Sequence, residues 1–293
     1  LIGHRLTHLL RANTRAGSQR NIQAHYDLGN DFYRLWLDPS MSYSSALGLG
    51  VGEPLERAQQ RKYRNVLQQL DVRPGQMILE IGCGWGGFAE IAVKEYGCRV
   101  LGLTLSKEQL AWARQRAEQG GWAGAADFEL CDYRDVRGSY DHIVSVEMME
   151  AVGERFWPGY FAQIRDRLKP GGRAVVQTIT IADALFRGYR KGTDFIQRYV
   201  FPGGMLPSPA VFGQHVRKAG LVVAGDMAFG QDYAETLVRW RDGFEAALPE
   251  VRALGYDERF VRLWRFYLAY CEAGFRAGSV DVHQFQLRHA PSD

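Results

Sequence analysis

Residues 77–87 read MILEIGCGWGG, a short apolar run that leads directly into a cluster of glycines. The apolar part predicts a buried strand, and Gly82, Gly84 and Gly86 follow where the chain turns into a helix expected over 88–95. A ligand that approaches the backbone at such a turn would collide with any Cβ, so glycines there favour a bound cofactor over a tight turn without a ligand.

Strand and helix patterns alternate outward from this turn. Strands are expected over 99–103, 126–130, 141–146 and 173–180, and helices over 106–119 and 157–168. Ser106 stands at a cap position with Gln109 three residues on, and the sequence KPGG at 169–172 predicts a turn. This alternation predicts an α/β fold with a mostly parallel sheet.

The spacing around the glycines selects the class of cofactor. Glu80 begins an ExGxGxG pattern, which differs from the GxGxxG of dinucleotide-binding proteins. The second strand ends in GLTLS at 102–106, with hydroxyls where a dinucleotide ribose receives a carboxylate. We therefore expect a cofactor with an adenosine, a sulfonium and an amino acid tail, which is S-adenosylmethionine, in place of NAD.

Composition sets outer limits on the function. The 293 residues are 46% hydrophobic and 24% charged, enough for a full core, and the net charge of +3 is too small to predict nucleic-acid binding. No run of 18 apolar residues occurs, so we expect neither a membrane span nor a signal peptide, and a cytoplasmic location. The four cysteines lack metal-ligand spacing, and no metal is expected. Because the sequence begins with Leu1, we expect a segment upstream of it.

Two clusters of basic residues are candidates for contact with an anionic membrane, the alternative being solvated helix faces. They are Arg11, Arg15 and Arg20, and Arg187, Arg190, Lys191 and Arg198.

Several stretches beyond the glycine turn resemble the cyclopropane-fatty-acyl-phospholipid synthase family, relatives of the mycolic acid cyclopropane synthases. They are HYDLGNDFYRLWLDPSMSYSSA at 25–46, LGLTLSKEQ at 101–109, DYRDV at 132–136, EMMEAVG at 147–153, FIQRYVFPGGMLPS at 195–208, QDYAETLVRW at 231–240 and GFRAG at 274–278. The resemblance covers nearly the whole chain from about residue 21, and several of these motifs are more specific than the glycine turn.

The resemblance implies a Rossmann-like, seven-stranded class I methyltransferase sheet with helices on both faces. It further implies a helical segment over 1–60 that covers the cofactor site. A methyltransferase domain follows over 61–293, with a lid or acyl-binding insertion at about 181–208.

The implied reaction is methyl transfer from S-adenosylmethionine to the cis double bond of a phospholipid acyl chain, which leaves a carbocation that then loses a proton. Loss from the transferred methyl group closes a cyclopropane, whereas loss from elsewhere gives a methylene- or methyl-branched chain. The implied partners are unsaturated phospholipid, reached by transient contact at the inner face of the membrane, and a second copy of the chain in a homodimer.

Carried over by position, the expected cofactor-binding residues are Tyr43, Ser44, Glu80, Gly82, Gly84, Gly86, Thr104, Gln109, Tyr133 and Arg134. In the family's pattern the glycines line the methionine part, Thr104 and Gln109 the ribose, and Tyr133 and Arg134 the adenine.

The family's proton acceptor is regarded as a bound bicarbonate, which makes bicarbonate a second expected ligand. Its cage maps to Glu150, Ile179 and Tyr233, with Ser45 in place of the usual Cys and Gln177 in place of the usual His. Ser and Gln still donate hydrogen bonds to an anion, but Gln does not titrate near neutral pH.

Plainer interpretations stay open for these residues. Glu150 is alternatively a helix-start carboxylate, with Glu147 close enough to share its work, and Tyr233 is alternatively a core tyrosine. Gln177 lies in an apolar strand, where a buried amide needs partners.

Two other functions compete with lipid methylation. One is a methyltransferase for a small molecule with an O or N nucleophile, and the other is a cofactor-binding protein without catalysis. Dependence on unsaturated phospholipid distinguishes the first interpretation from both.

Overall fold

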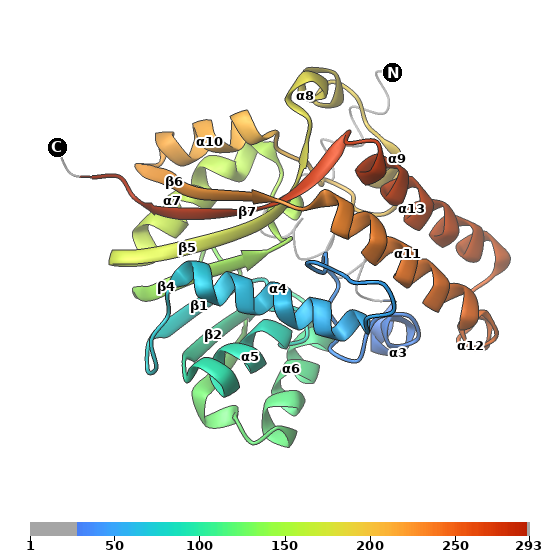
Figure 1. Ribbon diagram of the computed structural model, residues 1–293, viewed down its shortest axis with the longest axis horizontal. Coiled ribbons are helices and arrows are strands. Elements are labelled where there is room, and N and C mark those ends of the chain that lie inside the picture. The colour runs from blue at the N-terminus through green and yellow to red at the C-terminus, as the bar shows by residue number, and fades with distance from the viewer. Residues whose placement is uncertain (1–27, 292–293) are drawn as a thin grey trace.

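The computed structural model describes residues 28–291, and its centre is a seven-stranded sheet in the order β3-β2-β1-β4-β5-β7-β6 (Figure 1). The strands β1 to β5 are mutually parallel, and β7 runs antiparallel to both β5 and β6. The strands are β1 (Met77–Ile81), β2 (Arg99–Thr104), β3 (Ala126–Leu130), β4 (Tyr140–Val146), β5 (Leu168–Ile181), β6 (Leu221–Ala228) and β7 (Val280–His289). This mixed sheet confirms the expected methyltransferase fold class.

The five strands expected from the sequence are all present, but the turn expected at 169–172 is wrong. These residues belong to β5, where the register with β4 shifts between Tyr140 and His142. The extra residues form an irregularity within the strand, so KPGG produces a bulge in the ladder. No strand pattern in the sequence predicted the last two strands, β6 and β7.

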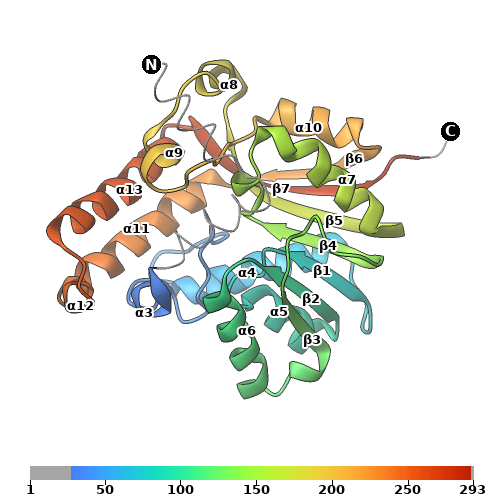
Figure 2. The same cartoon turned by 180° about the vertical axis from the view of Figure 1, so that it is seen from behind.

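Helices cover both faces of the sheet, with α4 and α5 in front in Figure 1 and α7 and α10 in front in Figure 2. The helices are α3 (Gly29–Arg34), α4 (Leu55–Leu70), α5 (Gly87–Tyr96), α6 (Lys107–Gln119), α7 (Trp157–Arg167), α8 (Asp183–Tyr189), α9 (Phe195–Tyr199), α10 (Pro209–Lys218), α11 (Gly230–Ala246), α12 (Leu248–Ala253) and α13 (Glu258–Arg276). Single 3-10 turns are η1 (Ala123–Ala125), η2 (Met149–Ala151) and η3 (Glu154–Phe156). The side chain of Ser106 caps α6 by accepting from the backbone N–H of Gln109, as expected.

Alternation along the central strands builds two cores. Ile78 and Val144 pack with α4, α5 and α6, whereas their neighbours Leu79 and Ile143 pack with α7 and α10 on the opposite face. Because parallel strands are buried on both faces, a run such as MILEI carries apolar side chains in both directions.

A third core lies beyond the carboxyl ends of the parallel strands and consists mainly of aromatic side chains. It joins α3 to α11 and α13 through residues such as Phe32, Trp36, Trp240 and Trp264. The ring centroids of Trp36 and Trp240 lie 5.7 Å apart, and those of Phe32 and Trp264 lie 5.1 Å apart. This core places α3, near the start of the described chain, against the end of the sheet that holds the glycine turn.

The insertion expected at 181–208 contains α8 and α9; α9 lies beside α13 in both views, and α8 projects at the top of the molecule (Figures 1 and 2). Its return to the body passes the end of β4, because the backbone N–H of Met205 donates to the carbonyl of Glu150 over 2.9 Å. The boundary expected at residue 60 falls inside α4, and residues 1–27 of the expected N-terminal segment, including Arg11, Arg15 and Arg20, lie outside the described residues. Over residues 28–291, no helix combines the length and apolar character needed to cross a bilayer.

Candidate active site

The glycine turn between β1 and α5 adopts a backbone that favours glycine. The φ angles of Gly82, Gly84 and Gly86 are +85°, +52° and +83°, in the left-handed region. A Cβ on Gly82 would stand 2.9 Å from Cγ of Met148, while a Cβ on Gly84 would meet nothing within 4 Å. The turn is therefore closed toward Met148 and open at Gly84, where a ligand can reach the backbone.

Glu80 lies at the carboxyl end of β1 and has a buried carboxylate oxygen without a partner. The residue is 3% exposed, and Oε2 receives no hydrogen bond in the structure. Burial raises the pKa of this carboxyl well above its usual range, and the charge of Lys62 opposes the shift. A buried acceptor without a donor is costly unless a ligand supplies one. The α-ammonium of S-adenosylmethionine is such a donor, so the residues present fit this cofactor.

The other expected cofactor residues lie at the ends of neighbouring strands. Thr104, the last residue of β2, donates its hydroxyl to Oε1 of Gln109 over 2.9 Å. After β3, the guanidinium of Arg134 pairs with Asp132 at 2.5 Å and lies 5.6 Å from the ring centre of Tyr133. The carboxyl ends of parallel strands are where α/β folds bind ligands, and these groups surround that edge.

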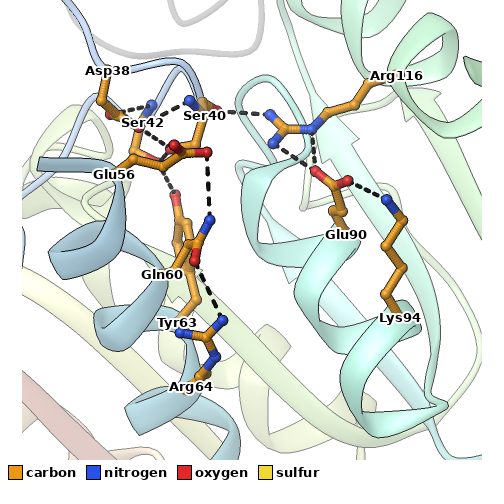
Figure 3. A network of polar contacts seen from close by, with 10 residues as sticks. All are labelled: Asp38, Ser40, Ser42, Glu56, Gln60, Tyr63, Arg64, Glu90, Lys94 and Arg116. Carbon is orange, nitrogen blue, oxygen red and sulfur yellow. Dashed lines mark hydrogen bonds and ion pairs between the residues drawn. The ribbon is translucent and has the colours of Figure 1, made fainter. Parts of the chain in front are cut away.

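A polar network fixes the loop that precedes Tyr43 and Ser44 (Figure 3). The backbone N–H of Ser42 donates to Asp38, and its hydroxyl lies 3.1 Å from the hydroxyl of Tyr63 on α4. Arg116 on α6 donates to the carbonyl of Ser40 over 2.7 Å and is itself paired with Glu90 on α5. Contacts from α4 and α6, which lie on the same face of the sheet, thus hold this loop in place.

Tyr43 and Ser44 then turn toward the interior. The hydroxyl of Tyr43 lies 2.8 Å from that of Tyr267 on α13. Lys62, a fully buried lysine on α4, donates to Oγ of Ser44 at 2.5 Å and to Oε1 of Gln59 at 2.7 Å. Burial lowers the pKa of Lys62 to about 7, although nearby carboxylates, Glu147 first among them, counteract part of the shift.

The carboxylate of Glu147, immediately after β4, collects three donors from three separate segments. Oε1 accepts from the backbone N–H of Ser45 and from Nε2 of Gln177, each over 2.8 Å. Oε2 accepts from the hydroxyl of Tyr233 on α11 over 2.6 Å. Burial raises the pKa of Glu147, and these hydrogen bonds and the charge of Lys62 oppose the shift. Glu147 also has a φ of +50°, an uncommon backbone for any residue with a Cβ.

A chain of buried amides fixes which end of Gln177 faces Glu147. Oε1 of Gln177 accepts from Nε2 of Gln284 on β7 over 2.9 Å. Oε1 of Gln284 in turn accepts from Asn65 and Gln69 on α4, over 2.7 and 2.5 Å. Because the oxygen of Gln177 is taken, its NH2 group must point at the carboxylate, which meets the expectation that this buried amide has partners.

Glu150 forms a second, separate set of contacts one turn further along. Its Oε1 accepts from the backbone N–H of Ile179 over 2.5 Å and from the hydroxyl of Thr178 over 3.0 Å. Its Oε2 is buried without a partner. Burial and the charge of Glu147 raise the pKa of Glu150 to about 8.

The five residues expected around one anion therefore divide between two carboxylates. Ser45, Gln177 and Tyr233 all donate to Glu147, whereas Ile179 donates to Glu150. The side chain of Ser45 is not a donor to the cage, contrary to expectation, because its hydroxyl donates to the carbonyl of Ala46. The donors expected for bicarbonate are thus bonded to a side chain of the protein, and the residues present do not fit a separate anion.

Sequence reasoning missed Lys62 and the central place of Glu147. Glu147 had a signal, since a second acidic residue stood three positions before Glu150 and directly after an expected strand. Lys62 had none, because one lysine in a polar helix predicts a solvated face.

Comparison with known proteins identifies similar sequences and a similar fold. The sequence profile described as mycolic acid cyclopropane synthetase matches residues 13–285. Tuberculostearic acid methyltransferase UfaA1 of Mycobacterium tuberculosis is 42% identical over 286 residues, which cover 94% of this chain and 66% of that protein. Cyclopropane-fatty-acyl-phospholipid synthase of Escherichia coli is 39% identical over 265 residues, which cover 89% of this chain and 65% of that protein. The chain thus spans about two thirds of the length of these curated relatives.

The fold matches solved structures closely. The crystal structure of mycolic acid cyclopropane synthase CmaA1, complexed with SAH and CTAB, aligns with a TM-score of 0.86 at 31% identity and covers 92% of this chain and 97% of that one.

Proposed function

Because this chain belongs to the mycolic acid cyclopropane synthetase family, whose cofactor is S-adenosylmethionine, we propose that it methylates the cis double bond of an unsaturated phospholipid acyl chain. The observation that carries the proposal is the pair of carboxylates, Glu147 and Glu150, which lie partly buried beside the glycine turn. Transfer to an O or N nucleophile needs little beyond proximity, whereas methylation of an alkene leaves a cation that must lose a proton from carbon. Met148, which lies between the carboxylates in sequence, is the residue that a Cβ on Gly82 would touch.

The bound cofactor supplies an electrophilic methyl group, and the protein positions the reactants and excludes water from them. The glycine turn and Glu80 hold the amino acid end, and Thr104 and Gln109 the ribose side. Tyr43 and the aromatic core around Trp36 and Trp240 exclude water and offer ring faces to a developing cation. An alkene is a weak nucleophile, so holding it in line with the methyl group is the largest contribution that positioning can make.

The proposed product is a cyclopropane acyl chain, formed when the proton leaves the transferred methyl group. A second product, a methylene- or methyl-branched chain, is favoured by two observations. The relative that is 42% identical carries the name of a tuberculostearic acid methyltransferase, and the chain departs from the family's cage at Ser45 and Gln177. Catalytic hydrogenation of the product lipid distinguishes the two, because an alkene takes up hydrogen under mild conditions that leave the ring intact.

Contact with a membrane is part of the proposal, and α8, α9 and α13 form the surface that supports it. Three aromatic side chains there are unusually exposed for their size, namely Tyr199 at 52%, Phe266 at 53% and Tyr270 at 41%. The neighbouring residues Arg187, Arg190, Lys191 and Arg198 are also exposed. Aromatic rings beside basic side chains suit the interface between lipid headgroups and acyl chains. The insertion between β5 and α10 is thus proposed to receive the acyl chain.

The test is transfer of label from methyl-labelled S-adenosylmethionine into liposomes. We expect incorporation with cis-monounsaturated phosphatidylglycerol or phosphatidylethanolamine and none with the saturated lipids of the same headgroups. Equal labelling of both, or label only in water-soluble products, would favour the small-molecule alternative. Retention of the cofactor without any transfer would favour the non-catalytic one.

The membrane surface has its own test. The triple variant Arg187→Glu, Arg190→Glu and Lys191→Glu should lose sedimentation with anionic liposomes. The matched triple change of Arg252, Arg259 and Arg262 to Glu should not, because these residues lie on α12 and at the start of α13, before the part of α13 that contacts α9. Unchanged binding by the first variant would remove the proposed surface.

A further inference from the structure

The carboxylate of Glu147 has the surroundings of a bound anion. Its three donors come from the loop after Tyr43, from β5 and from α11, and three of the five residues expected around bicarbonate are among them. Each donor is fixed independently: Ser45 is fully buried, Gln177 is held by Gln284, and the ring of Tyr233 stacks on Phe275 at 4.4 Å. A second anion on these donors would require Glu147 to leave.

The backbone at Glu147 indicates that this side chain has a function. A φ of +50° is unfavourable for a residue with a Cβ and easy for glycine. The strain is maintained by contacts on both sides, since the backbone N–H of Glu147 also donates to the carbonyl of Gln177 over 2.8 Å. The fold therefore keeps an acidic side chain where local sterics would prefer none.

Between the two carboxylates, the surroundings make Glu147 the charged one. It receives three donors, and Lys62 attracts its negative charge. Glu150 has one oxygen without any donor and lies close enough for the charge of Glu147 to oppose its ionisation. A proton on Glu150 removes the repulsion between the two charges, because two neighbouring carboxyls shielded from water do not both ionise.

One acceptor position on Glu147 remains open. Oε1 already accepts two hydrogen bonds, whereas Oε2 accepts only that of Tyr233. A carboxylate oxygen has about two acceptor positions, so Oε2 retains one.

We propose that Glu147 is the proton acceptor of the reaction, a carboxylate of the protein itself in the place where the family resemblance implied a bound bicarbonate. In this step the methylated chain is a carbocation, and Oε2 of Glu147 forms a bond to one of its protons. The electron pair of the broken C–H bond closes the ring or forms a double bond, and the neutral carboxylic acid then releases its proton to water. The inference rests on the proposed function.

The experiment compares two variants in buffer depleted of carbon dioxide, with and without added bicarbonate. Glu147→Gly removes a side chain slightly larger than bicarbonate and so leaves room for that anion, and glycine adopts the local φ of +50° easily. Glu147→Gln keeps the space filled but removes the basic oxygen. We expect wild-type turnover to be independent of bicarbonate, and both variants to lose about a hundredfold or more in rate. Added bicarbonate should raise the rate of the Gly variant at least tenfold and leave the rate of the Gln variant unchanged.

Two results of the turnover experiment would overturn the inference. They are stimulation of the wild-type protein by bicarbonate, and near-normal turnover by Glu147→Gln, which retains the side-chain shape if the Gly variant fails to fold. A binding measurement separates this inference from the proposed function. In 13C NMR, the resonance of labelled bicarbonate should broaden through binding to Glu147→Gly and stay sharp with the wild-type protein, even if no lipid is methylated. Broadening with the wild-type protein would count against a resident carboxylate.

Discussion

Replacing Tyr233 by Phe should shift the pH dependence of methyl transfer, because the lost hydroxyl is a donor to Glu147 over 2.6 Å. This hydrogen bond favours the ionised carboxylate and holds its pKa down against the effect of burial. A hydrogen bond to a charged group contributes about 1.5–3 kcal/mol. Since one pKa unit corresponds to about 1.4 kcal/mol, the pKa of Glu147 should rise by a further ~1–2 units.

The consequence for the rate depends on pH in a defined direction. If the ionised carboxylate accepts the proton, the acidic limb of the rate profile moves upward by the same ~1–2 units. The variant then loses about tenfold to a hundredfold in rate below the limb and recovers part of it at higher pH. The stability of the fold changes with the same sign. The pKa of Glu147 is raised in the folded protein, so ionisation of this residue opposes folding. Tyr233→Phe raises that pKa further, so the unfolding free energy of the variant should fall further below that of the wild type as pH rises from the wild-type pKa to the variant pKa.

The assay is single-turnover transfer of labelled methyl to cis-unsaturated liposomes between pH 5.5 and 9, with urea unfolding at the same pH values. Tyr256→Phe is the matched control, because its hydroxyl donates to the backbone carbonyl of Leu28 and contacts no carboxylate. An acidic limb that stays in place in Tyr233→Phe, with only a uniform drop in rate, would refute the reasoning and leave Tyr233 a packing residue.

Three further substitutions have distinct expected outcomes. Lys62→Met should remove a pH dependence of stability. The pKa of Lys62 is lowered to about 7 in the folded protein, so wild-type unfolding free energy should rise by a few kcal/mol between pH 7 and 10.5 relative to the variant, as measured in urea. Ser45→Ala should change the rate less than about threefold, because only the backbone N–H of Ser45 reaches the carboxylate. A loss comparable to that of a general base would contradict this geometry. Gln284→Leu should cost about 1–3 kcal/mol in urea unfolding, because it leaves the buried oxygen of Gln177 without its donor. An unchanged midpoint would show that the amide chain does not orient Gln177.

The sequence predicts the first part of the fold well because its signals are local. A strand such as MILEI, a capped helix after Ser106 and glycines at a turn each depend on neighbours within a few residues. The turn expected at 169–172 failed because the pairing of β5 with β4 absorbs those residues, and pairing is a contact between distant segments. The strands β6 and β7 alternate only weakly, because β7 has four consecutive buried residues and every residue of β6 after Leu221 is at least partly exposed.

The sequence predicted which residues form the site but not which of them bond to one another. Along the chain, Ser45 lies 132 residues before Gln177, and Gln177 lies 56 residues before Tyr233. The resemblance names these residues without naming their partners. All three donate to Glu147, a single residue with an unusual backbone φ that no periodicity in the sequence reveals. Lys62 is the opposite case, because its burial follows from the loop packed over α4 and not from its polar helix.

The most direct test of the account uses S-adenosylmethionine with a trideuterated methyl group, cis-monounsaturated liposomes and mass spectrometry of the released acyl chains. The account predicts chains that gain one carbon and keep all but one deuterium, since a base removes a proton from the transferred methyl group. Chains that keep every deuterium would place the proton loss elsewhere and exclude the ring. Chains without any label would contradict the central claim that this protein methylates acyl double bonds.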